Sequence, residues 1–246
     1  MNKDQKIAII IINWKKYDFT LSCIDSVLKS SYKNFKIVLI DNESQKDLSN
    51  EFEKNKNIHI IKNEKNEGFA RANNQAIKYS IKNGFDYILL LNNDTIIKYD
   101  LLGSLIKQSN TLNQQIIQPL ILNYDGSKIW NAGGTINNFF GTFHTLKKGK
   151  IFKNFKSNSC LTEWFTGCCV FINTDIFKDI GYFDERFFAY YEDIDFSIRL
   201  KKMGYSIALM TDSHLQHYES ASSKSINKTE GNLSPYVHYL NIRNHI

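Results

Sequence analysis

The 246-residue sequence has no run of about 20 consecutive apolar residues, the length that a helix needs to cross a bilayer. Its first apolar run, residues 7–12, is short and is not followed by a small-residue cleavage site. The start of the chain is therefore interpreted as a first strand rather than a signal peptide. The 4 cysteines form no CxxC pair, and adjacent residues such as Cys168 and Cys169 rarely bridge each other. These absences favour a protein of the reducing cytoplasm.

Three motifs with well-understood chemistry are also missing. The sequence contains no GxGxxG, no GxxxxGK(S/T) and no GxSxG, so dinucleotide-binding, P-loop and hydrolase-elbow functions lack their key residues. No dense Lys/Arg stripe accompanies the formal net charge of +6, and nucleic acid is therefore not expected as a partner. The mild excess of basic over acidic residues is compatible with binding of an anionic small molecule or an anionic membrane surface. The most basic stretch, residues 147–156, is interpreted as a solvated loop.

Hydrophobic residues make up 42% of the chain, enough for the core of one globular domain or of two closely fused lobes. In the first hundred residues, continuous apolar runs alternate with amphipathic segments. The runs lie at 7–12, 37–40, 58–61 and 87–91, and the clearest helical pattern lies at 69–81. This alternation predicts a mostly parallel sheet that is covered by helices on both faces.

The second half of the chain has shorter and less regular elements. Strands are expected at 116–118, 129–131, 168–172 and 206–210, and the strongest helix at 192–203, with Gly204 just past its end. A shorter helix is expected to be capped by Thr174 or Asp175 and to stop at Gly181. The second half is therefore expected to be mixed in its architecture.

Each of the first four predicted strands ends in polar side chains. Asn13 follows the first strand, Asp41 and Asn42 the second, Asn63 the third, and Asn92, Asn93 and Asp94 the fourth. Because ligands gather at the carboxyl ends of parallel strands, these side chains predict a polar ligand across one edge of the sheet. Asp94 is a candidate ligand for Mg²⁺ or Mn²⁺, although NNDT is also good turn chemistry. His214 and His217 are interpreted either as metal ligands or as ordinary buried histidines.

Residues 183–205, FDERFFAYYEDIDFSIRLKKMGY, form the densest group of candidates. Glu192, Asp193 and Asp195 fall within one turn at a helix start, where the helix dipole favours negative charge. Capping explains this pattern, with Asp195 and Arg199 as an i,i+4 ion pair, and a functional role for the other acids is the alternative. The preceding aromatic residues are explained by core packing or by a wall for a sugar or nucleotide.

The motifs together resemble family-2 glycosyltransferases with the GT-A fold, especially the bacterial rhamnosyltransferase-like enzymes of surface polysaccharide assembly. The elements that carry the resemblance are IIINWKKYDFT, IVLIDNESQKD, NEKNEGFARANNQAI, LLLNNDT, FTGCCVFI and GYFDERFFAYYEDIDFSIRLKKMGY. It implies one α/β domain over residues 1–246, a Rossmann-like, mostly parallel sheet flanked by helices. Residues 1–110 would bind the nucleotide sugar, and 111–246 would form an acceptor-binding and catalytic half. Relatives usually continue into further helices beyond YVHYLNIRNHI, which this chain is expected to lack.

The resemblance also implies roles for individual residues. The donor, a UDP- or dTDP-sugar, would be bound by Asn13, Asp41, Asn66, Gly68, Arg71, Asn92 and Asn93. Asp94 and His217 would hold Mg²⁺ or Mn²⁺ beside the diphosphate, and Asp193 would be the catalytic base. Glu43 stands where the family usually has Gly. Asn92 and Asn93 stand where the family has acids, which leaves a single carboxylate in that motif.

The expected function is inverting transfer of a sugar to a hydroxyl of a glycan or lipid-linked glycan, in the cytoplasm or peripherally at the inner face of the membrane. One alternative is a sugar-nucleotidyltransferase, which would need a Gly- and Arg-rich phosphate loop where this sequence has NWKKYDFT. The other is a non-catalytic nucleotide-sugar-binding module, which would tolerate loss of Asp94 and Asp193, and both acids are present.

Overall fold

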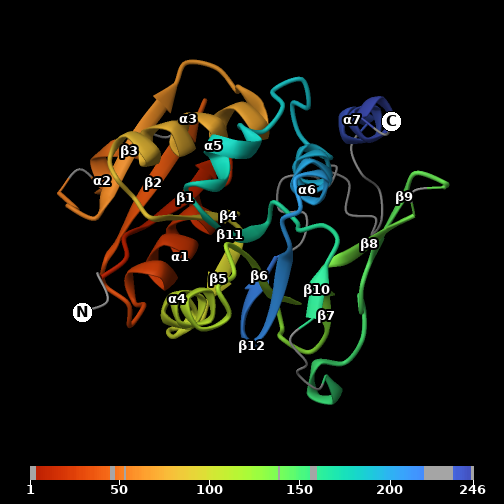
Figure 1. Ribbon diagram of the computed structural model, residues 1–246. Coiled ribbons are helices and arrows are strands. Elements are labelled where there is room, and N and C mark those ends of the chain that lie inside the picture. Colours follow the sequence, from red (N-terminus) through yellow and green to blue (C-terminus); the bar gives the residue numbers. More distant parts are fainter. Residues whose placement is uncertain are drawn as a thin grey trace.

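A large sheet forms the centre of the molecule (Figure 1). The computed structural model describes residues 4–44, 48–52, 54–137, 139–155, 160–218 and 235–244. The main strand order is β10-β12-β6-β11-β4-β1-β2-β3. Strands β1 (Ile7–Asn13), β2 (Phe35–Asn42), β3 (Ile58–Asn63) and β4 (Tyr87–Leu91) run parallel to one another. Their carboxyl ends therefore meet at one edge of the sheet.

The other half of the sheet is mixed. Strand β6 (Ile116–Asn123) is parallel to β12 (Ile207–His217), whereas β11 (Cys169–Asn173) is antiparallel to both β4 and β6. The short strands are β5 (Thr95–Ile97), β7 (Ile129–Asn131), β10 (Cys160–Thr162) and a separate hairpin of β8 (Gly134–Asn137) and β9 (Thr142–Thr145). Because β11 lies between β4 and β6, the two halves share one continuous sheet.

Helices cover both faces of the sheet (Figure 1). Helices α1 (Tyr17–Leu28) and α4 (Leu101–Leu112) pack on one face, and α3 (Gly68–Lys82), α5 (Ile176–Ile180) and α6 (Glu192–Lys202) on the other. Helices α2 (Ser49–Phe52), α7 (Pro235–Asn244) and the 3₁₀ turn Phe152–Asn154 complete the described elements. Alternate residues of β1 enter opposite cores, which explains its unbroken apolar sequence. Among the described residues, no helix is both long and apolar enough to cross a membrane.

The predicted α/β architecture is confirmed. Strand β4 spans the predicted residues 87–91, and α3 extends the predicted 69–81 by one residue at each end. Strand β12 is longer than the predicted 206–210, because an irregularity between Met210 and His214 lets pairing with β6 continue past a polar interruption. Helix α4 and the β8–β9 hairpin have no counterpart among the expected elements. Cys168 and Cys169 do not bridge each other.

Candidate active site

A cavity of about 860 Å³ opens where the parallel strands β1 and β4 end. Ile12, Trp14 and residues 92–94 line it from this sheet edge. The opposite wall comes from the β8–β9 hairpin, from α7, and from the aromatic loop, as we call residues 183–191, which leads into α6. Small-molecule sites typically have volumes of about 300–1,000 Å³. The cavity therefore has the size of a site for a small ligand.

Unpaired polar atoms concentrate in this cavity. In the described part of the chain, six buried side-chain nitrogen or oxygen atoms lack a hydrogen-bond partner, and all six belong to residues that line the cavity. They are Nε1 of Trp14, Trp130 and Trp164, Oδ1 of Asp94, Oε2 of Glu192 and Nδ1 of His217. Buried polar groups are nearly always hydrogen-bonded in folded proteins. Their clustering indicates a place built for a polar ligand.

Asp94 and His217 contact each other in the lining of this cavity. Asp94 follows β4 and His217 ends β12, and the Tyr218 amide donates a 2.9 Å hydrogen bond to the Asp94 carbonyl. Oδ1 of Asp94 lies 3.2 Å from Nε2 of His217, and both side chains are buried. Burial alone lowers the pKa of His217, but the neighbouring Cys168 and Asp94 raise it to about 10. The imidazole is therefore protonated at neutral pH and lies beside the Asp94 carboxyl.

The Asp94–His217 pair suits a divalent cation that is shared with a phosphorylated ligand. Apart from their contact with each other, Oδ1 of Asp94 and Nδ1 of His217 have no hydrogen-bond partner. No group of three or more His, Cys, Asp or Glu side chains within the described ranges is arranged to hold a metal ion. Mg²⁺ is often bound by one or two carboxylates, with substrate phosphates and water at the other positions. The pair therefore fits such a cation, provided that His217 loses its proton.

Glu192 and Asp193, the first residues of α6, both line the cavity. Asp193 accepts hydrogen bonds from the Gly167 amide at 2.8 Å and the Ile194 amide at 2.9 Å. Burial raises the pKa of Asp193 despite these two bonds, which lower it. The position at the helix start was expected to favour the ionised form of this carboxylate, whereas burial acts in the opposite direction and outweighs the amide contacts. Burial and the charge of Asp193 raise the pKa of Glu192 well above its ordinary value.

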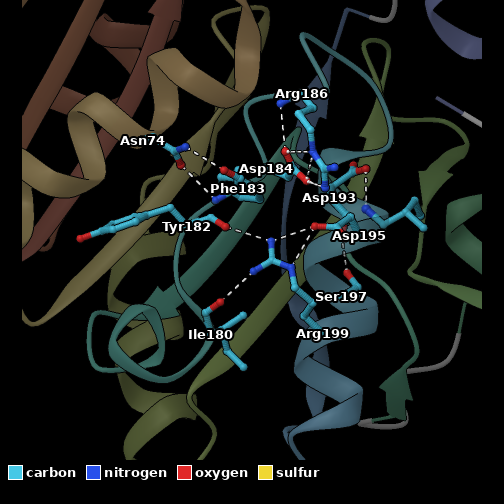
Figure 2. Close-up of polar contacts among 11 residues, drawn as sticks. Asn74, Ile180, Tyr182, Phe183, Asp184, Arg186, Asp193, Asp195, Ser197 and Arg199 are labelled. Carbon is cyan, nitrogen blue, oxygen red and sulfur yellow. Dashed lines mark hydrogen bonds and ion pairs between the residues drawn. The ribbon is translucent and has the colours of Figure 1, made fainter. Parts of the chain in front are cut away.

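Polar contacts fix the position of the α6 start (Figure 2). The predicted ion pair is confirmed, with 2.8 Å between Nη2 of Arg199 and Oδ2 of Asp195. Arg199 also donates to the carbonyl oxygens of Ile180 and Tyr182, at 2.8 and 2.9 Å. Asn74 of α3 donates to the carbonyl of Phe183 and accepts from its amide. Asp195 thus holds Arg199, which ties α6 to the segment that directly precedes the aromatic loop.

The predicted site residues divide into two groups. Those that line the cavity are Asn66, Asn92, Asn93, Asp94, Asp193 and His217. Those that lie outside its lining are Asn13, Asp41, Gly68 and Arg71.

Local contacts account for the second group. Asn13 accepts a 2.6 Å hydrogen bond from Thr20, and Asp41 accepts one of 3.1 Å from the Ser44 amide. Arg71 pairs with Glu67 at 3.2 Å. Gly68 has φ +80, and a Cβ there would lie 2.4 Å from the Phe188 carbonyl oxygen, so its glycine is needed for packing against the aromatic loop.

Several lining residues escaped sequence reasoning. Trp130 and Trp164 were open between sugar platforms and core, and both line the cavity, but Trp14 was missed although the chain has only 3 tryptophans. Lys148 lies 5.8 Å from the ring centroid of Trp130, so part of the basic stretch expected to be a solvated loop faces the site. His214 instead packs against Phe152 and does not line the cavity.

Comparisons with known proteins agree with this geometry. The hexosyltransferase Agl10 of low-salt glycan biosynthesis in Haloferax volcanii is 28% identical, across 97% of this chain and 73% of that protein. The dTDP-rhamnosyl transferase RfbF of Shigella flexneri is 22% identical, across 98% of this chain and 79% of that protein. The crystal structure of GalNAc-T7 with UDP, GalNAc and Mn²⁺ superimposes with a TM-score of 0.71 at 17% identity, across 94% of this chain. This chain spans only 45% of that structure, so the likeness concerns the fold.

A family match covers most of the sequence. Residues 8–181 match the family described as Glycosyl transferase family 2. The mostly parallel sheet, its helices and the structural similarity to GalNAc-T7 identify the GT-A fold. The chain therefore belongs to glycosyl transferase family 2, as its motifs predicted.

Proposed function

We propose that the protein is an inverting glycosyltransferase that moves a hexose or deoxyhexose from UDP or dTDP to a hydroxyl of a glycan. One observation carries this proposal: in the described residues, every buried side-chain nitrogen or oxygen without a hydrogen-bond partner belongs to a residue that lines the cavity at the sheet edge. Its donors and acceptors match a ligand that is rich in hydroxyl and phosphate oxygens. Family membership and the hexosyl- and rhamnosyltransferase relatives support the same reaction class.

The donor half of the site is proposed to lie in residues 1–110. Asn92, Asn93 and Asn66 would hydrogen-bond the nucleoside and sugar, and Asp41, which lies at the end of β2 outside the cavity lining, would accept the N3–H of uracil or thymine. Asp94 and His217 would hold Mg²⁺ or Mn²⁺. When bound, the cation would offset negative charge on the departing diphosphate. Trp130 and Lys148 line the cavity beside this pair and would add N–H donors to the same region.

Asp193 is proposed as the general base of the acceptor half, residues 111–246. Its two amide contacts favour the ionised form, whereas Oε2 of Glu192 has no partner and its raised pKa favours the protonated form. A carboxylate has about four acceptor positions, so two amide bonds leave room for an acceptor hydroxyl. Asp193 would take the proton as that oxygen attacks the anomeric carbon from the face opposite the diphosphate. Such a displacement inverts the anomeric centre.

The acceptor is proposed to be a glycan or a lipid-linked glycan presented at a membrane surface. Phe139 and Phe140, at the tip of the β8–β9 hairpin beside the cavity, are 86% and 70% exposed. The net charge of +6 suits an anionic membrane surface. Cosedimentation with anionic phospholipid vesicles checks this part of the proposal, and binding should weaken in Phe139→Ser/Phe140→Ser.

Turnover with a panel of nucleotide sugars tests the proposed reaction. The protein is incubated with Mn²⁺ and UDP- or dTDP-linked hexoses and deoxyhexoses, with and without glycan acceptors, and release of the nucleoside diphosphate is measured. Acceptor-stimulated release supports the proposal. Tight nucleotide-sugar binding with no release for any acceptor would instead indicate a non-catalytic binding module. Formation of a nucleoside triphosphate from pyrophosphate and the sugar nucleotide would indicate a nucleotidyltransferase.

A further inference from the structure

The aromatic loop enters α6 through two strained residues. Tyr190 has φ +69 and Tyr191 has φ +71, so two consecutive non-glycine residues adopt the left-handed region. Bulky side chains rarely adopt this conformation, and it persists only where the surroundings hold it. Glu192 and Asp193 follow directly as the first residues of α6. The left-handed pair therefore sets the direction in which the two cavity carboxyls leave the loop.

Helix α7 holds this strained turn through one side chain. Nδ2 of Asn244 donates 2.8 Å hydrogen bonds to the carbonyl oxygens of both Ala189 and Tyr190. These two bonds use both hydrogens of the amide. Asn244 is only 5% exposed, whereas the other buried residues of α7, Val237 and Leu240, are apolar. Core packing therefore does not explain an amide at this position, but the two carbonyls do.

Two further contacts hold the same loop. The Phe69 amide, at the start of α3, donates a 2.6 Å hydrogen bond to the carbonyl of Phe188. Nη2 of Arg243 donates to the carbonyl of Arg186 at 3.1 Å. The contact from α3 binds Phe188, which precedes the left-handed pair in the sequence. The carbonyl of Tyr190 itself is bound by the side chain of Asn244. Helix α7 also contributes Leu240 and Asn241 to the cavity lining, outside the family-matched residues 8–181.

We propose that Asn244 is a positioning residue for the acceptor half of the site. It stabilises the left-handed turn at Tyr190 and thereby holds the Glu192 and Asp193 carboxyls in the cavity. Helix α7 is then part of the catalytic unit. This inference rests on the proposed transferase function for its kinetic consequence, but its structural step is independent of any substrate.

Hydrogen exchange tests the structural step without a substrate. Asn244→Asp keeps the side-chain size but removes both N–H donors. Amides of residues 187–195 should exchange about tenfold faster in this variant, because local opening of the loop becomes easier. Ile242→Ala is the matched control, since Ile242 lies in the same helical turn and is 76% exposed. Unchanged exchange in Asn244→Asp would overturn the proposal.

A rescue by glycine separates positioning from general stability. Asn244→Asp should lower turnover about tenfold, a modest loss for a misplaced catalytic group, and leave UDP or dTDP affinity within about twofold. Glycine adopts the left-handed region without strain, so in a Tyr190→Gly background the same substitution should cost less than about threefold. Equal losses in both backgrounds would overturn the positioning role. If wild-type protein releases no diphosphate from any donor, the proposed function fails, and the exchange result still decides the structural step.

Discussion

A carboxyl group accepts a proton from a substrate only if it is ionised first, and the surroundings of Glu192 and Asp193 differ in this respect. Burial raises the pKa of both carboxyls, but two amide N–H bonds oppose it at Asp193, whereas at Glu192 the charge of Asp193 adds to it and Oε2 has no hydrogen-bond partner, although backbone hydrogen bonds to Glu192 act against the rise. Adjacent carboxyls in one cavity titrate as a pair, and the better-solvated anion loses its proton first. Both side chains line the same cavity. We therefore expect one ionised base with a protonated neighbour.

Replacing the base should separate chemistry from binding. Asp193→Asn keeps size and much of the hydrogen bonding but removes proton acceptance, so turnover should fall by about 10²–10⁴. Calorimetric affinity for UDP or dTDP should change little, because the base contacts the acceptor rather than the diphosphate. Asp195→Asn is the control: it breaks the pair with Arg199, so it should lower thermal stability and keep most of the turnover. Near wild-type turnover in Asp193→Asn would remove the residue from this role.

Glu192 should make stability depend on pH in a defined direction. Its pKa is raised in the folded state, so its contribution to stability is fully present below the unfolded pKa of about 4.5 and is lost as pH rises through the folded pKa. Glu192→Gln does not titrate, so its Tm should rise relative to wild type between pH 5 and pH 8. A gain of at least about 2 °C corresponds to roughly 1 kcal/mol in a domain of this size. Asp18→Asn, at an exposed position, is the control and should show no such trend.

The aromatic loop joins the core under α3 and α6 to the cavity. Phe183 is buried beside α3 and α6, Phe188 and Tyr190 line the cavity, and both explanations of the aromatic run therefore hold for different residues. Sequence patterns predicted the α6 helix and its Asp195–Arg199 pair because these depend on residues three or four positions apart. They did not predict the attachment of this loop to α7, since Asn244 contacts residues 54 and 55 positions away.

Gly68 provides a test of how closely this loop must approach α3. A Cβ at Gly68 would lie 2.4 Å from the Phe188 carbonyl oxygen, whereas at Gly84 it would meet nothing within 4 Å, and both residues have positive φ. Gly84→Ala should therefore cost only the backbone strain, about 1–2 kcal/mol. Gly68→Ala should cost more in chemical denaturation and also lower turnover, because the loop must move. Equal stability losses with equal turnover would show that the loop tolerates displacement.

At the scale of the whole molecule, one sheet edge collects groups from distant parts of the sequence. The first half was predictable because buried parallel strands have continuous apolar runs and polar side chains at their ends. The opposite wall was not, because its short elements depend on tertiary contacts. Gly134 of β8 shows this: a Cβ there would lie 1.9 Å from the indole nitrogen of Trp164, a constraint that no local pattern reveals. One wall of the cavity thus follows from the parallel strands, and the opposite wall follows from long-range packing.

Ligand binding at this shared edge should stabilise the whole domain, because the site exists only when both halves of the sheet are folded. At a concentration of about 100 times the Kd, a ligand specific for the folded state adds roughly 2.7 kcal/mol, which corresponds to about 5–10 °C in Tm for a domain of this size. We expect UDP or dTDP with Mn²⁺ to give such a shift, and CDP and GDP to give a smaller one if Asp41 accepts the N3–H of the base. A chelator, Asp94→Ala and His217→Ala should each reduce the shift, whereas Asp18→Ala should not. An equal shift in chelator would exclude a metal role for Asp94 and His217, and a larger shift with GDP would place a purine in the donor.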